Sequence, residues 1–165
     1  SPYDRYVKGD KTAMTEQQVR GLETFAKVGC TACHSGPAFN GSANMPAGLG
    51  FFMKFPTFPG SEYDAQYKLM EDTGRHVVTQ KDTDKYLWRV QTLRNLTYTA
   101  TYFHNGSAKS LDEAVRVMGK TQLNKDLSDG EVKDIVAFLG ALDGEFPQQI
   151  MPRLPPTPGD LLTEN

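Results

Sequence analysis

The chain has 165 residues, of which 38% are hydrophobic, and a formal net charge of −2. A chain of this length can bury a hydrophobic core as one domain. It contains no run of about 18 apolar residues, so no membrane-spanning helix is predicted. Its near-neutral charge argues against a sequence-independent nucleic-acid binder, which needs a basic stripe. Because the chain starts at Ser1, we expect either a removed export signal or a piece of a longer protein.

The first predicted helix covers residues 16–28. Thr15 is a suitable N-cap with Gln18 at the capping-box position, and apolar residues recur at helical spacing. Gly29 is expected to end this helix. The string Cys30-Thr31-Ala32-Cys33-His34 follows directly.

A long middle section has weak periodicity. Residues 35–60 are rich in Gly, Pro and Phe, which predicts an irregular loop. Loops of that length in compact domains are typical of functional segments or of chain wrapped around something. Residues 62–70 favour a short helix, whereas residues 77–79 and 87–92 favour short extended pieces.

Two more helices are predicted towards the C-terminus, over residues 111–118 and 130–142. Each begins with a capping box, whose N-caps are Ser110 and Ser128, and Gly119 is expected to end the first of them. The second carries an apolar stripe at helical spacing. The first and last long helices are expected to cross.

We divide the chain into a domain of residues 1–146 and an arm of residues 147–165. The arm is rich in proline, which disfavours regular secondary structure. We expect it to pack as extended chain or to hang loose.

The Cys-rich string is the attachment pattern for haem c. Thiols three residues apart, here Cys30 and Cys33, can add to both vinyl groups on one porphyrin edge, and His34 can then bind the iron. A redox-active Cys pair usually opens a helix, whereas this pair closes one. A zinc site would need further ligands, but His76 and His104 lie at no zinc-like spacing. The sequence thus predicts a mainly α, cytochrome c-like fold with long irregular loops around one covalent haem c.

The sixth iron ligand decides what such a haem does. A protein side chain in that position favours electron transfer, whereas an open position lets small molecules bind and react. Met118 is the preferred candidate, because it ends a short capped helix close to the last one, although Met often fills gaps in a core. The other candidates are Met14, Met45, Met53, Met70, Met151, His76 and His104. A His/Met pair raises the reduction potential relative to two imidazoles.

An ordered set of short motifs extends along the chain. It comprises the attachment motif with residues 35–39, then residues 74–75, 89–95, 102–106, 111–119, 122–123 and 134–139. With this set the chain resembles the C-terminal, high-potential haem domain of bacterial di-haem cytochrome c peroxidases. The resemblance implies that His34 and Met118 bind the iron. It also implies that the haem accepts electrons from a small cytochrome or cupredoxin and passes them to a peroxidatic haem in an N-terminal domain, where hydrogen peroxide is reduced.

The resemblance implies a calcium ion between the two domains, bound partly by backbone carbonyls at the positions of Thr99 and Thr101. It places His104 near the haem at the domain interface, and it leaves room for a homodimer. Arg94 is a candidate partner for a haem propionate, because a buried carboxylate needs a cationic or hydrogen-bonding group. Haem c attachment in bacteria takes place outside the inner membrane, which implies export to the periplasm.

The chain departs from the family in two ways. Gln91 and Thr101 stand where the family usually has Pro, which puts the rigidity of that loop in doubt. Only one attachment motif is present, so the peroxidatic half is missing and the chain is either a fragment or a stand-alone relative. Related maturases that oxidise protein side chains have Tyr at the position of Met118, which argues against that branch.

With Met118 on the iron, the chain would offer neither an open iron position nor an acid–base group for peroxide cleavage. We therefore expect electron transfer with little peroxidase turnover from this chain alone. The alternatives are an independent monohaem electron carrier and, if the sixth position is labile, a haem-based ligand sensor.

Overall fold

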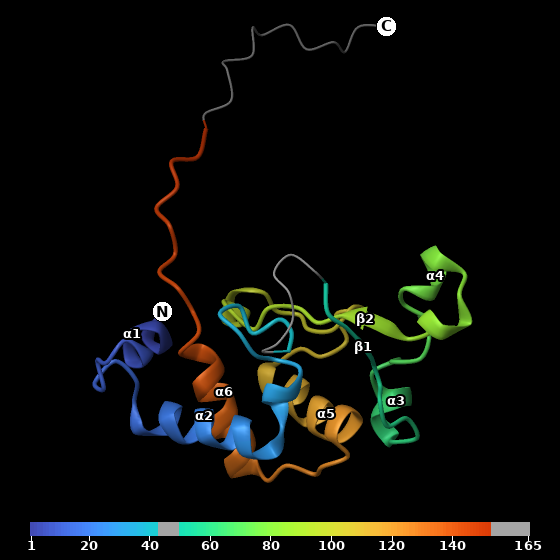
Figure 1. The fold of residues 1–165 in the computed structure, drawn as a ribbon, viewed down its shortest axis with the longest axis horizontal. Helices are drawn as coiled ribbons and strands as arrows, with labels where there is room; N and C mark the ends of the chain where they lie inside the picture. Colours follow the sequence, from blue (N-terminus) through green and yellow to red (C-terminus); the bar gives the residue numbers. More distant parts are fainter. Residues whose placement is uncertain (43–49, 153–165) are drawn as a thin grey trace, which may run out of the picture.

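The computed structural model describes residues 1–42 and 50–152 (Figure 1). Its α-helices are α1 (Pro2–Val7), α2 (Glu16–Val28), α3 (Glu62–Gln66), α4 (His76–Thr79), α5 (Leu111–Leu123) and α6 (Asp129–Gly140). Three 3-10 helices are η1 (Cys30–Ala32), η2 (Asp82–Asp84) and η3 (Leu96–Tyr98). Two strands, β1 (Phe52–Lys54) and β2 (Leu87–Arg89), pair antiparallel with Phe52 opposite Arg89. Within the described ranges no helix is long and apolar enough to cross a membrane.

Helices α2 and α6 cross, as predicted, and they touch at Gly21. A Cβ atom built on Gly21 would lie 1.9 Å from the carbonyl oxygen of Asp134 and 2.8 Å from the Cβ of Phe138. Such an approach is open only to a residue without a side chain. Capping boxes begin both helices, with Thr15 and Ser128 as N-caps.

Helix α5 is longer than predicted. Its capping box joins Ser110 and Glu113, but the helix continues through Gly119 to Leu123. The predicted stop at Gly119 is wrong, because this glycine makes room for a neighbour: a Cβ there would lie 2.9 Å from the side chain of Leu127. Asn124, with a φ of 51°, ends the helix instead.

The middle of the chain is irregular, as predicted. The short elements predicted within it are partly wrong. Residues 77–79 form helix α4 rather than an extended piece, because the N–H groups of residues 77–80 bond the carbonyls of residues 74–76. The predicted helix over residues 62–70 stops at Gln66, and the extended piece from Leu87 is a strand only as far as Arg89.

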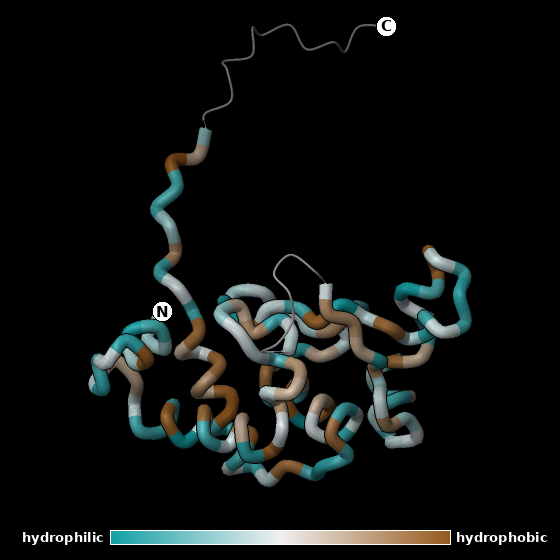
Figure 2. Tube along the Cα trace, in the orientation of Figure 1, coloured by the Kyte–Doolittle hydropathy of each residue, from teal (hydrophilic) through white to brown (hydrophobic). Residues whose placement is uncertain are grey.

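The buried side chains form two clusters. The first joins α2 and α6 with the chain on either side; its buried members are Met14, Phe25, Val28, Phe39, Ile135, Phe138, Leu139, Ala141 and Leu142. The second lies between α5 and the middle of the chain and contains Phe55, Tyr67, Leu69, Ala108, Ala114 and Val117. Helix α5 contributes to both clusters, because Val115 packs against the first and Val117 belongs to the second. Figure 2 shows the hydrophobic residues gathered along α5 and α6 inside the body.

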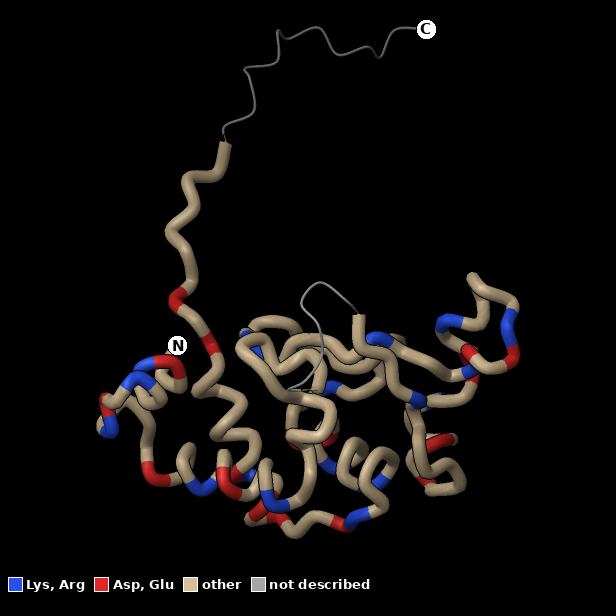
Figure 3. The backbone as a smooth tube through the Cα atoms, viewed as in Figure 1, with Lys and Arg blue, Asp and Glu red and all other residues tan. Residues whose placement is uncertain are grey.

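Charged residues are unevenly placed along the chain. No Asp, Glu, Lys or Arg occurs between Lys27 and Lys54. Figure 3 shows the described part of this segment as a tan stretch without blue or red, whereas α2 and α5 carry charges of both signs. The segment includes the attachment motif, where Thr31 and Ala32 are exposed, and the residues just after it, where Gly36 and Pro37 are exposed.

Residues 147–152 have no regular secondary structure and are exposed. In Figure 1 this segment leads away from the body. The remainder of the predicted arm, residues 153–165, lies outside the described residues. The division of the chain at residue 146 stays a prediction.

Candidate functional site

The attachment motif begins where α2 ends. Gly29 takes the left-handed conformation, with a φ of 109°, and turns the chain into the 3-10 helix Cys30–Ala32. Cys30 and Cys33 form no disulfide with each other. Burial raises the pKa of Cys30 to about 11, and burial also raises the pKa of Cys33. A redox-active pair needs a thiol with a lowered pKa, so these thiols are poorly suited to disulfide exchange.

The imidazole of His34 is oriented by the backbone. Its Nδ1 lies 3.0 Å from the carbonyl oxygen of Phe39. Because a carbonyl oxygen only accepts hydrogen bonds, Nδ1 carries the proton and Nε2 keeps a free lone pair. Burial lowers the pKa of His34, which favours the neutral form that binds metals. The residues present thus fit a covalent haem: two thiols, and a histidine prepared for ligation in the way typical of metal-binding histidines.

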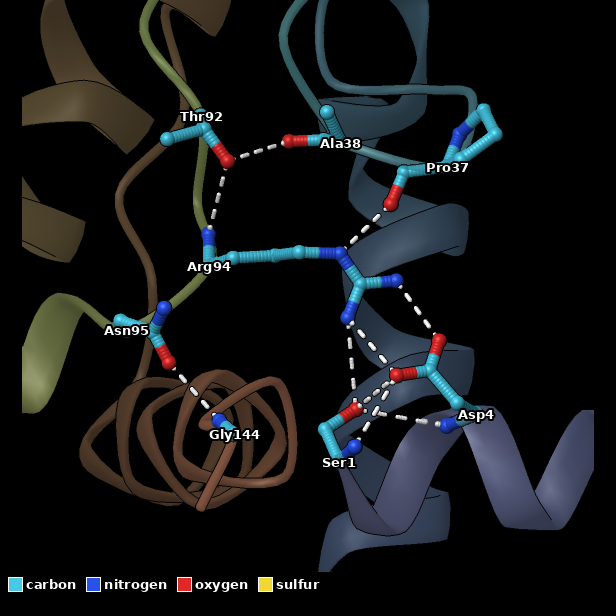
Figure 4. Close-up of polar contacts among 8 residues, drawn as sticks. All are labelled: Ser1, Asp4, Pro37, Ala38, Thr92, Arg94, Asn95 and Gly144. Carbon is cyan, nitrogen blue, oxygen red and sulfur yellow. Dashed lines mark hydrogen bonds and ion pairs between the residues drawn. The ribbon is translucent and has the colours of Figure 1, made fainter. Parts of the chain in front are cut away.

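The carbonyls just before Phe39 are also bonded (Figure 4). Arg94 donates from Nε to the carbonyl oxygen of Pro37 at 2.6 Å, and Thr92 donates from Oγ1 to that of Ala38 at 2.6 Å. The terminal nitrogens of Arg94 donate to the two carboxylate oxygens of Asp4 at 3.0 and 2.7 Å. Arg94 holds the pKa of Asp4 well below its usual range.

Arg94 was predicted to pair with a haem propionate. In the structure all three of its guanidinium nitrogens already have protein partners, which are Pro37, Asp4 and Ser1. A contact between Arg94 and a propionate stays a prediction.

Met118 lies on α5, partly buried against the second cluster, where Trp88 also packs. His34 lies beside Phe25 of the first cluster, with 6.5 Å between ring centroids. The structure therefore places the two predicted iron ligands at different clusters, with helix α5 shared between them. A single domain usually has one continuous core, so a flat apolar group such as haem would join these two.

The other candidates for the sixth ligand are scattered. Met14 is buried in the first cluster, Met70 and Met151 are exposed, Met53 pairs with Trp88 across β1 and β2, and His76 lies on α4. Met45 lies outside the described residues.

His104 stacks on Trp88, with ring centroids 4.0 Å apart and planes 14° apart. Trp88 Nε1 and both ring nitrogens of His104 are buried, and they have no hydrogen-bond partner within the described residues. Buried polar atoms are normally bonded, so these nitrogens fit a polar group that is not part of the described chain. Burial lowers the pKa of His104.

Thr99 and Thr101, the predicted calcium positions, are exposed residues that follow η3. Thr99 Oγ1 donates to the carbonyl of Leu96 at 3.3 Å. The part of the chain that the structure describes holds no group of three or more His, Cys, Asp or Glu side chains suited to a metal ion. The predicted calcium ligands are backbone carbonyls, so calcium at Thr99 and Thr101 stays a prediction.

The roles of Asp4, Phe39 and Thr92 were missed at the sequence level. Phe39 acts through its backbone carbonyl, which every residue has, so its identity carries no signal. Thr92 and Arg94 lie within the motif of residues 89–95, but nothing in the sequence pairs them with residues 37–38. Asp4 lies 90 positions before Arg94, and no local pattern connects them.

Comparison with known proteins identifies relatives of nearly the whole chain. It is 43% identical over 155 residues to a cytochrome c551 peroxidase of Pseudomonas aeruginosa and 37% identical over 160 residues to that of Nitrosomonas europaea. These matches cover 94% and 97% of this chain but only 42% and 44% of the relatives. The chain therefore matches one region of the di-haem cytochrome c peroxidases and spans less than half of their length. No family model matches it.

A solved structure of a MauG-like protein associated with microbial copper homeostasis superimposes with a TM-score of 0.67. The match covers 88% of this chain and 52% of that one, at 24% sequence identity. At this identity the likeness concerns the fold, and it agrees with the predicted cytochrome c-like architecture.

Proposed function

We propose that this chain is the electron-transferring haem c domain of a bacterial di-haem cytochrome c peroxidase, the C-terminal domain of such an enzyme. The observation that carries the proposal is the hydrogen bond between His34 Nδ1 and the Phe39 carbonyl, directly after two thiols at haem-attachment spacing. The relatives are named peroxidases and are over twice as long as this chain, which supports a larger peroxidase as the enzyme to which the domain belongs.

Each residue has a defined part in this function. Cys30 and Cys33 would hold the haem through thioether bonds, and His34 would offer Nε2 to the iron. Met118 would offer its thioether sulfur from α5, which would keep peroxide away from the iron and favour a high potential. When bound, haem c supplies an iron that takes up and releases one electron.

The partners follow from the same proposal. A small cytochrome or cupredoxin donates electrons, and a peroxidatic haem domain receives them, in the periplasm. The buried nitrogens of Trp88 and His104, which have no hydrogen-bond partner within the described residues, support a polar contact at these two rings, with a haem propionate or with the second domain.

The test begins with the chain produced in a host that attaches haem c. We expect haem to remain bound after denaturation, and to be lost when Cys30 and Cys33 are both replaced by alanine. The oxidised protein should show the weak far-red band of sulfur-to-iron charge transfer, and Met118→Ala should abolish it. Met53→Ala is the matched control and should keep the band. A band that survives Met118→Ala contradicts the assigned ligand.

Peroxidase activity separates this role from direct catalysis. With a reduced cytochrome donor, the isolated chain should turn over hydrogen peroxide very slowly. A turnover on the order of 100 per second, ordinary for an enzyme, would show that the iron is open. The presence of a single attachment motif also suits a stand-alone monohaem carrier. Such a carrier would exchange electrons with other proteins and would show no enhanced peroxide reduction when mixed with a peroxidatic domain.

A further inference from the structure

The loop of residues 37–39 has its three successive carbonyl groups bonded by three different side chains. Arg94 binds the carbonyl of Pro37, Thr92 that of Ala38, and His34 that of Phe39. The first two bonds each join donor and acceptor at 2.6 Å. The backbone that orients the imidazole is thus fixed from outside the attachment motif.

The two side chains that fix this loop are themselves anchored. The hydroxyl of Thr92 accepts from the N–H of Arg94 at 3.1 Å, and the guanidinium of Arg94 is held by the carboxylate of Asp4. Asn95, the next residue, accepts from the N–H of Gly144 at 2.7 Å (Figure 4). The segment 92–95 therefore connects helix α1, Gly144 in the chain that follows α6, and the loop of residues 37–39 in one hydrogen-bond network.

We propose that Thr92 and Arg94 are positioning residues for His34, the residue that would bind the haem iron. This inference rests on the proposed function. Thr92 and Arg94 act through the backbone, because they keep the Phe39 carbonyl where it accepts the Nδ1–H of His34. A hydrogen bond at Nδ1 makes the imidazole a stronger electron donor at Nε2. Stronger donation stabilises ferric iron, so the network lowers the reduction potential below the value that the same two ligands would give without it.

Arg94 is suited to this task by its shape. Its planar fork binds the carboxylate of Asp4 with two nitrogens while Nε remains directed at the Pro37 carbonyl. Lysine offers a single point charge and cannot make both contacts in fixed geometry. Thr92 contributes one hydroxyl, so its removal is the milder perturbation.

The experiment uses the haem-loaded chain and two readouts other than activity. One is the solvent-exchange rate of the His34 Nδ1 proton in the ferrous form, measured by NMR on ¹⁵N-histidine-labelled protein. The other is the reduction potential. Thr92→Val should speed the exchange about tenfold, the size expected of one hydrogen bond. Arg94→Gln, which removes several contacts, should speed it more. Both variants should also raise the reduction potential of the haem. A tenfold loss of preference for ferric over ferrous iron corresponds to a rise of about 59 mV for a one-electron couple.

Matched controls separate positioning from general loosening. Thr97→Val removes a hydroxyl that bonds the carboxylate of Asp143, and Arg116→Lys disturbs an arginine that bonds the carboxylate of Asp129 and the carbonyl of Leu127. Both should leave the exchange rate and the potential at the wild-type values. Thr92→Ser retains the hydroxyl and should keep both the exchange rate and the reduction potential at the wild-type values.

The outcomes are distinct. If Arg94→Gln fails to fold, Thr92→Val still decides, because it changes a single exposed hydroxyl. Unchanged exchange and potential in Thr92→Val, with haem attached and the far-red band present, overturn the positioning role alone. A wild-type chain that attaches no haem overturns the proposed function and the positioning role together.

Discussion

Replacing Gly21 with alanine tests the closeness of the crossing between α2 and α6. The new Cβ would lie 1.9 Å from the Asp134 carbonyl oxygen and 2.7 Å from the carbonyl carbon. Both are backbone atoms, so no rotamer change relieves the overlap, and one helix must move by more than about 1 Å to reach ordinary van der Waals contact. Because the overlap is with backbone atoms, the overpacking cost should lie at the upper end of its usual range, about 3 kcal/mol, whereas alanine regains about 1 kcal/mol of helix propensity.

We therefore expect Gly21→Ala to lower the free energy of unfolding by about 2 kcal/mol. At about 2–4 °C per kcal/mol for a chain of this size, the melting temperature should fall by roughly 4–8 °C. The assay is thermal and urea unfolding of the haem-loaded chain, followed by far-UV circular dichroism. Gly130→Ala in α6 is the control, because no atom lies within 4 Å of the Cβ added there, and it should be neutral or stabilising. A Gly21→Ala variant as stable as Gly130→Ala would refute the close crossing.

Two further variants test local interactions. Ser110→Ala removes the N-cap of α5 and should cost about 1 kcal/mol in urea unfolding; Ser110→Thr, which keeps the cap, should cost little, and equal losses in the two would contradict the capping role. Asp4→Asn tests the ion pair with Arg94, which lowers the pKa of Asp4 in the folded state. The stabilisation from this pair is fully present above the ordinary carboxyl pKa of about 3.9, and it is lost as the pH falls through the lower folded-state pKa. The difference in urea midpoint between wild type and Asp4→Asn should therefore be constant from pH 7 to about pH 5 and shrink below about pH 4, whereas a difference that persists unchanged into acid would refute the assignment.

The helices were predictable where local rules and tertiary packing agree. Residues 16–28 carry a capping box, an apolar stripe and a terminal glycine, and α2 has these bounds. Gly119 shows the opposite case, since a glycine that normally ends a helix lies inside α5 to admit Leu127. The short middle elements depend on hydrogen bonds between loops, and for these the sequence contains no periodic signal.

The prediction of Cys30, Cys33 and His34 as haem-binding residues rests on a local pattern, because covalent attachment imposes a fixed spacing on them. The network around them was not predictable, because Asp4, Arg94 and the carbonyls of residues 37–38 lie far apart in the chain and meet only through the fold. A backbone carbonyl can be supplied by any residue type, so no amino-acid identity marks it.

The segment without charged residues has a consequence for encounters with a redox partner. Thr31, Ala32, Gly36 and Pro37 present exposed, uncharged surface around the attachment motif, and the charge of adjacent Arg94 is matched by Asp4. On the proposed function, a redox partner approaching this face meets no charge within the patch and one ammonium beside it, that of Lys125, which donates to the carbonyl of Val28. Association should therefore lie near the unsteered range of about 10⁵–10⁷ M⁻¹s⁻¹ and depend only weakly on ionic strength. Recognition there would rest on the fit of two neutral surfaces and on the water that they release.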